Sequence, residues 1–78
     1  MKNLLHVDTT PGIGEAFSPP EGFAGSYRDH LRMKWATNPL TRQYVAVVGR
    51  LVKNDYPVAF VGPYASEAKE IVALIWKH

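Results

Sequence analysis

Valine-rich apolar runs dominate the second half of the chain. Residues 43–52, QYVAVVGRLV, have no helical period in their apolar positions, and residues 58–62, VAFVG, form a shorter run. β-Branched residues favour strands, and a run that is apolar on both faces is typical of a covered strand. Asn54 and Asp55 lie between the runs and tolerate the positive φ of a hairpin turn. The pattern predicts an antiparallel hairpin, with Pro57 at an outward-facing edge.

A helix is predicted before this hairpin. Tyr27, Leu31 and Trp35 recur every four residues and so share one helix face. Ser26 precedes them and is a good N-cap, because its hydroxyl can accept an amide hydrogen bond from the first turn. Asn38-Pro39 should end the helix, since the residue before a proline is pushed out of the α region.

The C-terminal segment predicts a second helix. Gly62-Pro63 breaks the preceding strand, and Ser66 can cap the helix. Its apolar residues form one broad face: Ala68, Ile71, Val72, Leu74 and Ile75.

The N-terminal third reads as irregular chain. Residues 3–7 form a short apolar run. This run either forms a third strand or packs the N-terminus against the core. Residues 11–25 contain seven Pro or Gly, which disfavour regular structure. Ile13, Phe17 and Phe23 in this arm are too apolar for a solvated linker. We therefore expect the arm, residues 1–25, to lie against another surface.

These elements predict a single small α+β domain spanning residues 1–78. It comprises a short N-terminal helix, a two-stranded antiparallel hairpin with a third strand from residues 3–7 in one alternative, and a C-terminal helix. A chain of 78 residues buries only about 60–65% of its unfolded surface, so its core is thin. It has no cysteine, which excludes disulfides and thiolate metal sites. Tight packing or association must supply the missing stability.

The composition of the chain also bears on its cellular location and its charge. No secretory leader is visible at the start of the sequence, and no apolar run approaches the ~20 residues that cross a bilayer. We expect a cytoplasmic protein that does not engage membranes. The formal net charge is +2, and it is concentrated in residues 26–44, where four basic residues face one acidic residue.

No pattern of catalytic residues stands out. Gly12-Ile13-Gly14 lacks the third glycine and the flanking elements of a dinucleotide fingerprint. His6 and Asp8 could be two metal ligands, but no sequence pattern adds a third. We expect no catalytic residues, no metal site and no cofactor, and therefore no enzyme.

The segment RDHLRMKW, residues 28–35, interleaves cations with apolar and aromatic side chains of the types enriched in protein interfaces. We predict a non-catalytic protein that acts by protein–protein interaction and self-associates. The predicted contact residues come from the arm and the first helix: Ile13, Phe17, Phe23, Arg28, Arg32 and Trp35. In size and simplicity the chain resembles small accessory proteins of bacteriophages and bacteria, which implies binding to and modulation of a host macromolecule.

Two alternatives remain open. In the first, the protein binds nucleic acid, with cations on phosphates and an aromatic ring stacked on bases. The residues for that function are Arg28, Arg32, Lys34, Arg42 and Tyr44. In the second, residues 26–38 form a scaffold helix whose charges simply face water. The sequence identifies no partner.

Overall fold

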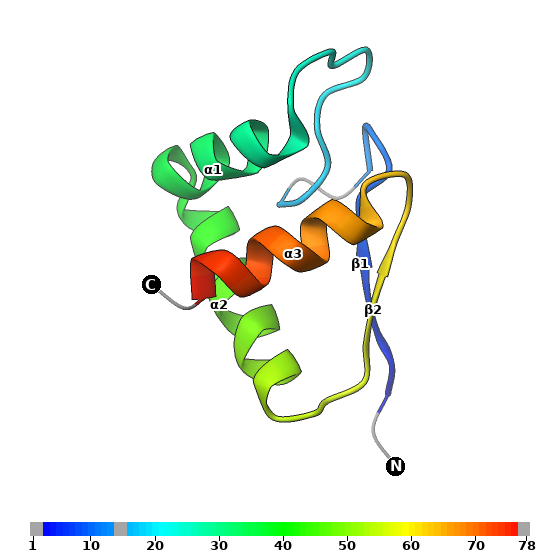
Figure 1. Ribbon diagram of the computed structural model, residues 1–78, viewed down its shortest axis with the longest axis vertical. Coiled ribbons are helices and arrows are strands. Elements are labelled where there is room, and N and C mark those ends of the chain that lie inside the picture. Colours follow the sequence, from blue (N-terminus) through cyan, green and yellow to red (C-terminus); the bar gives the residue numbers. More distant parts are fainter. Residues whose placement is uncertain (1–2, 14–15, 77–78) are drawn as a thin grey trace.

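Three helices and two strands make up the structure (Figure 1), a computed structural model that describes residues 3–13 and 16–76. In chain order they are β1 (Leu5–Asp8), α1 (Tyr27–Thr37), α2 (Pro39–Lys53), β2 (Val58–Val61) and α3 (Ala65–Trp76). The structure mixes helices and strands, but it differs from the predicted fold in the strand pairing, in the number of helices and in its start. The chain does not open with a short N-terminal helix: the strand β1 comes first, and the first helix begins only at Tyr27.

The two strands pair in parallel, so the predicted antiparallel hairpin is wrong. Leu5 lies opposite Val58 and Asp8 opposite Val61. The amides of Leu5 and Thr9 donate to the carbonyls of Pro57 and Val61, at 3.0 and 2.9 Å. The apolar run at residues 3–7 overlaps β1, which was predicted as a possible third strand beside the hairpin. In the structure β1 instead pairs directly with β2. Parallel pairing needs a long crossover between the strands, and α1 and α2 provide it.

The segment 43–52, predicted as a strand, lies inside α2. Asn38 caps this helix: its side-chain oxygen accepts hydrogen bonds from the amides of Leu40 and Thr41, at 2.9 and 3.4 Å. Pro39 follows at the first helical position, where its missing N–H costs nothing. Asn38-Pro39 does end the first helix as expected, but it also starts the next. Burial of the inner helix face outweighs the β propensity of the valines.

The helix ends elsewhere need smaller corrections. Ser26 is the N-cap residue of α1, although its side chain makes no capping hydrogen bond. The predicted cap Ser66 lies inside α3, which begins one residue earlier at Ala65. Asn54 and Asp55 do not form a hairpin turn. They follow the end of α2, and Asp55 has a positive φ of 58°.

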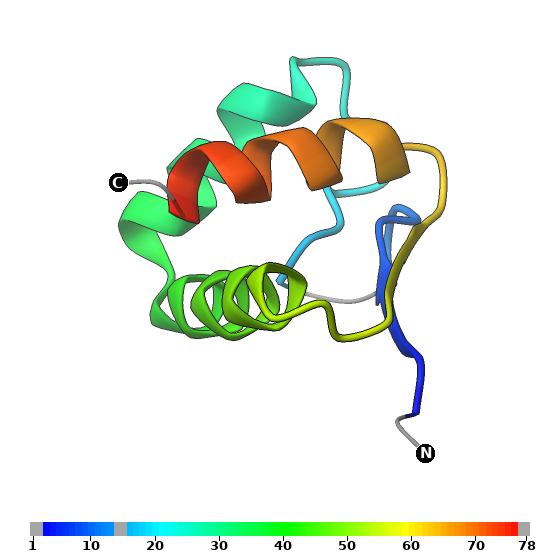
Figure 2. The same cartoon turned by 60° about the horizontal axis from the view of Figure 1, so that its bottom comes forward.

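The helices lie on one side of the two strands, as the two views in Figures 1 and 2 agree. The core between these layers contains aliphatic side chains and the aromatic rings of Phe17 and Tyr27. Leu31, Val45, Val48 and Ile71 are fully enclosed in it. Gly49 lets α2 and α3 approach closely, since a Cβ there would lie 3.0 Å from the Trp76 ring. The backbone of α2 at Gly49 therefore packs directly against the Trp76 side chain of α3.

Part of the N-terminal arm belongs to this core. Phe17 is 3% exposed, and its carbonyl accepts a hydrogen bond from the Tyr27 hydroxyl at 2.8 Å. The Thr41 hydroxyl donates to the carbonyl of Ala16 at 3.3 Å. These bonds tie the arm to α1 and α2 and fix the position of α2 relative to the rest of the chain.

Candidate functional site

The outer surface of α2 carries a line of apolar side chains. Thr41, Val45, Val48 and Gly49 face the core, while one adjoining side of the helix is exposed. On that side lie Leu40, Tyr44, Val47 and Leu51, which we call the α2 stripe. Leu40, Tyr44 and Val47 keep 48%, 39% and 52% of their surface exposed, and Leu51 is half-buried. Spacings of four, three and four residues keep these side chains in register along one helix face.

A shallow groove runs beside the stripe. It has a volume of about 440 Å³, and its walls are the four stripe residues together with Leu5, Gln43 and Val48. Leu5 comes from β1, so the groove lies where the strand layer meets α2. Isolated exposed apolar residues are normal on protein surfaces, but a contiguous line with a groove beside it is typical of an interaction site.

Tyr44 is held in a fixed place within the stripe. Its ring stands edge-on to the buried Phe17 ring, with centroids 5.5 Å apart and planes at 81°. This edge-to-face geometry is favourable for aromatic pairs. An anchored side chain loses little rotamer freedom when a partner covers it, so the stripe is partly preorganised for contact.

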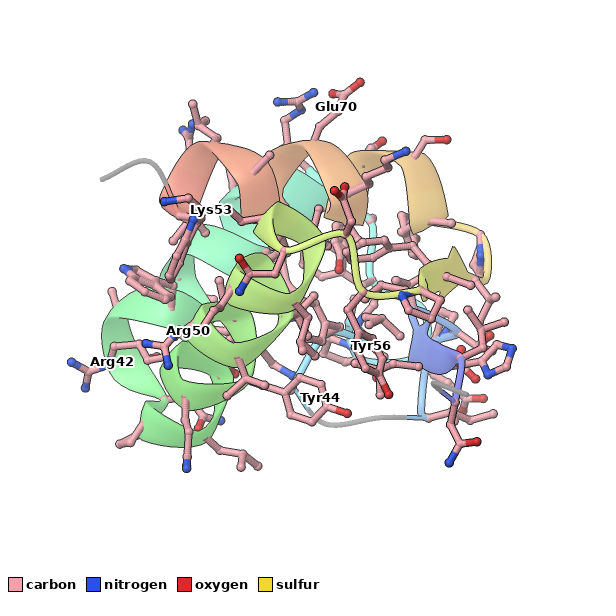
Figure 3. The ribbon with its side chains drawn as sticks, turned by 90° about the horizontal axis from the view of Figure 1, so that it is seen from below. Arg42, Tyr44, Arg50, Lys53, Tyr56 and Glu70 are labelled. Carbon is pink, nitrogen blue, oxygen red and sulfur yellow. The ribbon has the colours of Figure 1, made fainter. Side chains whose placement is uncertain are left out.

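Cations project from another side of α2. Figure 3 shows Arg42, Arg50 and Lys53 projecting from one side of α2, and Tyr44 pointing from an adjoining side. All three cations are exposed, and the sequence of α2 contains no acidic residue. The helix therefore combines an apolar face with a positive one.

The six residues predicted for protein contact are not gathered on one surface. Ile13 is exposed and Phe17 is buried, while Phe23 packs on the His30 ring with centroids 4.8 Å apart. Trp35 is half-buried against the core. On α1, Arg32 is exposed, and Arg28 pairs with Glu70 of α3. Phe17 contacts Tyr44 of the α2 stripe through its ring.

The residues of the nucleic-acid alternative are divided between two helices. Arg28, Arg32 and Lys34 belong to α1, and the Lys34 ammonium donates to the Ser18 carbonyl at 3.1 Å. Arg42 and Tyr44 belong to α2. The sequence analysis drew most of its predicted contact residues from α1 and the arm. In the structure, the larger exposed surface with apolar and cationic side chains belongs to α2.

Sequence reasoning missed Leu40, Val47 and Leu51. Together with Tyr44 they have the four-, three- and four-residue spacing of one helix face. Val47 and Leu51 lie in the segment 43–52, which was predicted as a strand in which alternate residues face opposite sides, and Leu40 lies before it. The N-cap and proline at Asn38 and Pro39 were the signals that could have corrected the period.

His30 is a buried titratable residue of α1. It is 5% exposed, and its Nε2 has no hydrogen-bond partner among the described residues. Burial and the nearby Lys34 cation lower the pKa of His30, whereas a hydrogen bond to the Ser18 backbone partly raises it. Burial and the charge of Glu67 raise the pKa of Tyr27. Neither His30 nor Tyr27 lines the α2 groove.

No metal centre is visible in residues 3–13 and 16–76, where no three His, Asp or Glu side chains come together. The two candidates from the sequence lie on β1. His6 is exposed, and the Asp8 carboxylate accepts the Thr10 amide hydrogen bond at 2.8 Å, which lowers the pKa of Asp8. The lone Gly12 turn falls partly outside the described residues, because Gly14 is not among them. Within the described helices, none has the length and apolarity that crossing a bilayer requires.

Comparisons with known proteins give no match, whether to a protein-family model, to a curated protein or to a solved structure.

Proposed function

We propose that this protein is a non-catalytic binding protein that acts through protein–protein contact at the α2 stripe. The supporting observation is the line of exposed apolar side chains, Leu40, Tyr44 and Val47, beside a groove of about 440 Å³. Aromatic side chains are enriched in the cores of protein interfaces, and charged residues other than arginine are depleted there. Tyr44 packs on Phe17, and tyrosine is one of the residue types enriched among those that carry most of the binding energy of interfaces.

The proposal places the contact on α2 rather than on the arm and α1. Phe17 has too little exposed surface to meet a partner directly, and Trp35 packs inward. Arg28 is engaged with Glu70 across the α1–α3 contact. Of the residues first predicted for protein contact, Phe17 keeps a role as the support of Tyr44.

The test uses two matched variants. Val47→Asp places a carboxylate in the stripe, and Met33→Asp places one at an equally exposed apolar site on α1, where 59% of Met33 is exposed. The wild type and each variant are immobilised, and the proteins that they retain are identified. Binding of each identified protein is then measured again with purified components, and purified wild-type chain is tested as a partner in the same way. We expect a protein bound by wild type and Met33→Asp that binds Val47→Asp at least about tenfold more weakly. Equal binding by all three, or no protein bound by any, would overturn the proposal.

The positive side of α2 supports a second candidate, nucleic-acid binding. Arg42, Arg50 and Lys53 project from one side of the helix, and the sequence of α2 supplies no carboxylate to oppose them. Three phosphate contacts would give a logarithmic salt slope of about −2 to −3. Binding to a DNA or RNA oligonucleotide with that slope, weakened by Arg42→Ala with Arg50→Ala but unchanged by the uncharged substitution Val47→Ser, would favour this candidate over protein contact.

A further inference from the structure

The strand β1 has one open edge. The amides of Leu5 and Thr9 donate to carbonyls of β2, so the backbone groups at these positions face β2. Backbone groups alternate between the two edges of a strand, and those of His6 and Asp8 therefore point away from β2. Among residues 3–13 and 16–76, these amides and carbonyls have no hydrogen-bond partner. An edge of this kind is a template for a further strand.

A groove follows this open edge. It has a volume of about 400 Å³, and its walls include His6, Val7 and Asp8 of β1 and Leu40 and Tyr44 of α2. The groove beside the α2 stripe shares Leu40 and Tyr44 with it, so the two are continuous. Figure 3 shows Tyr44 pointing from α2 toward the strands. The open edge and the α2 stripe are thus two walls of one channel, which we call the β1–α2 channel.

We infer that the β1–α2 channel takes an extended peptide segment of the partner protein, which adds to β1 as a third strand and turns alternate side chains onto the α2 stripe. This inference rests on the proposed function, because it names the form of the partner at the same surface. A helix does not supply what the edge lacks, since its backbone groups are paired within the helix. An extended segment has free N–H and C=O groups along both edges, and strand addition to an open sheet edge is a recurring mode of peptide recognition.

The faces of β1 determine which side chains the segment needs. Val7 is 1% exposed and points inward, so the peptide residue opposite it also points inward and meets the α2 stripe. His6 is exposed on the outer face, and the residues opposite His6 and Asp8 share that face. The Asp8 carboxylate favours a basic side chain opposite it, because opposite charges across a strand pair attract. The partner segment therefore alternates apolar residues with polar and basic ones.

A synthetic peptide tests the channel without knowledge of the natural partner. The probe is a fluorescently labelled peptide of about eight residues, about 26 Å when extended, in which valine alternates with threonine and lysine. Its control has the same composition with the valines grouped together. In fluorescence anisotropy with up to about 1 mM protein, the alternating peptide should bind at least about tenfold more tightly than the control. No binding of the alternating peptide, or equal binding of the two, would overturn the inference.

N-methylation of the peptide tests the backbone hydrogen bonds apart from the side chains. Methyl groups on the valine amides block one edge of the extended peptide, and methyl groups on the threonine and lysine amides block the other. With the valines turned toward α2, a parallel strand pairs with β1 through its valine amides and an antiparallel strand through the others. One methylated peptide should therefore bind at least about tenfold more weakly than the parent, while the other binds like it. If both bind as tightly as the parent, strand addition is wrong.

His6→Pro tests the same hydrogen bonds from the side of the protein. Proline has no N–H, and the His6 amide points away from β2, so the pairing of β1 with β2 is kept. We expect His6→Pro and Val47→Asp each to bind the alternating peptide at least about tenfold more weakly, and Met33→Asp to bind it like the wild type. A His6→Pro protein with wild-type circular dichroism and wild-type affinity for the peptide would contradict the inference.

The outcomes separate this inference from the proposed function. A captured protein that is lost by Val47→Asp but binds His6→Pro like the wild type overturns strand addition and leaves the proposed function in place. A chain that associates with itself through the His6 edge would have a second β1 as its occupant, which also overturns the inference. If Val47→Asp changes no binding at all, both fail.

Discussion

His30 links the stability of this small domain to pH. The buried imidazole packs against Phe23, and its pKa is lowered by burial and by Lys34. The unfolded chain therefore binds a proton at His30 more readily than the folded protein does. This component of stability is present above the ordinary pKa of about 6.5 and is lost as the pH falls through the lower folded pKa.

We expect urea unfolding to give a free energy that decreases as the pH drops from neutrality to about 5. A His30→Gln variant cannot take up a proton at this position, so its stability should change less over that range. His6→Gln removes an exposed histidine from β1 and serves as the control, with wild-type behaviour expected. A His30→Gln variant with the full wild-type pH dependence would contradict the assignment.

Gly62 is required where β2 leads into α3. Its φ is +100°, and a Cβ there would lie 2.6 Å from the Thr9 Oγ1 and 2.9 Å from the Thr10 amide nitrogen. Gly62→Ala combines backbone strain with this clash, and we expect it to lower the free energy of unfolding by about 2–4 kcal/mol.

Gly22→Ala is the matched control for Gly62→Ala. Gly22 also has a positive φ, of 75°, but a Cβ there would have no heavy atom within 4 Å. We expect this variant to lose only the backbone contribution, about 1–2 kcal/mol, in the same denaturation measurement. Equal losses for the two variants would show that the close approach between β1 and Gly62 does not matter.

At the scale of elements, α2 connects the scaffold to the proposed binding surface. Its inner face packs in the core through Val45 and Val48, and its outer face carries the stripe. Intrinsic preference favoured a strand for this valine-rich segment, and only the core formed with α1 and α3 settles the helix. Parallel pairing of β1 with β2 could not be predicted either, because the two strands lie far apart in the chain and no short turn connects them.

The cap of α2 should have a measurable effect on stability. Asn38→Ala removes the side-chain oxygen that accepts hydrogen bonds from Leu40 and Thr41. We expect a loss of about 1 kcal/mol in thermal or chemical unfolding, whereas Asn38→Ser keeps a capping oxygen and should lose less. An Asn38→Ala protein as stable as the wild type would mean that Pro39 and the core alone position the helix.

At the scale of the whole molecule, the sequence predicted a mixture of helices and strands and the segments of α1 and α3, but not the parallel pairing, the helix α2 or a strand ahead of the first helix. The helix that begins at Tyr27 was predicted from its four-residue spacing, and the C-terminal helix from its broad apolar face. Residue types alone pointed to a surface with aromatic and basic side chains. They could not show that Phe17 turns inward and Tyr44 outward, since that depends on how the arm folds over α2.

Backbone amide NMR spectra recorded across a dilution series, and with any protein captured by the wild type, test the central claim most directly. The account predicts that the largest chemical-shift changes fall within residues 40–51, on the amides of the α2 stripe and its neighbours. Changes centred on Arg28 and Arg32 of α1, or spectra that do not respond to concentration or to a captured protein, would contradict it.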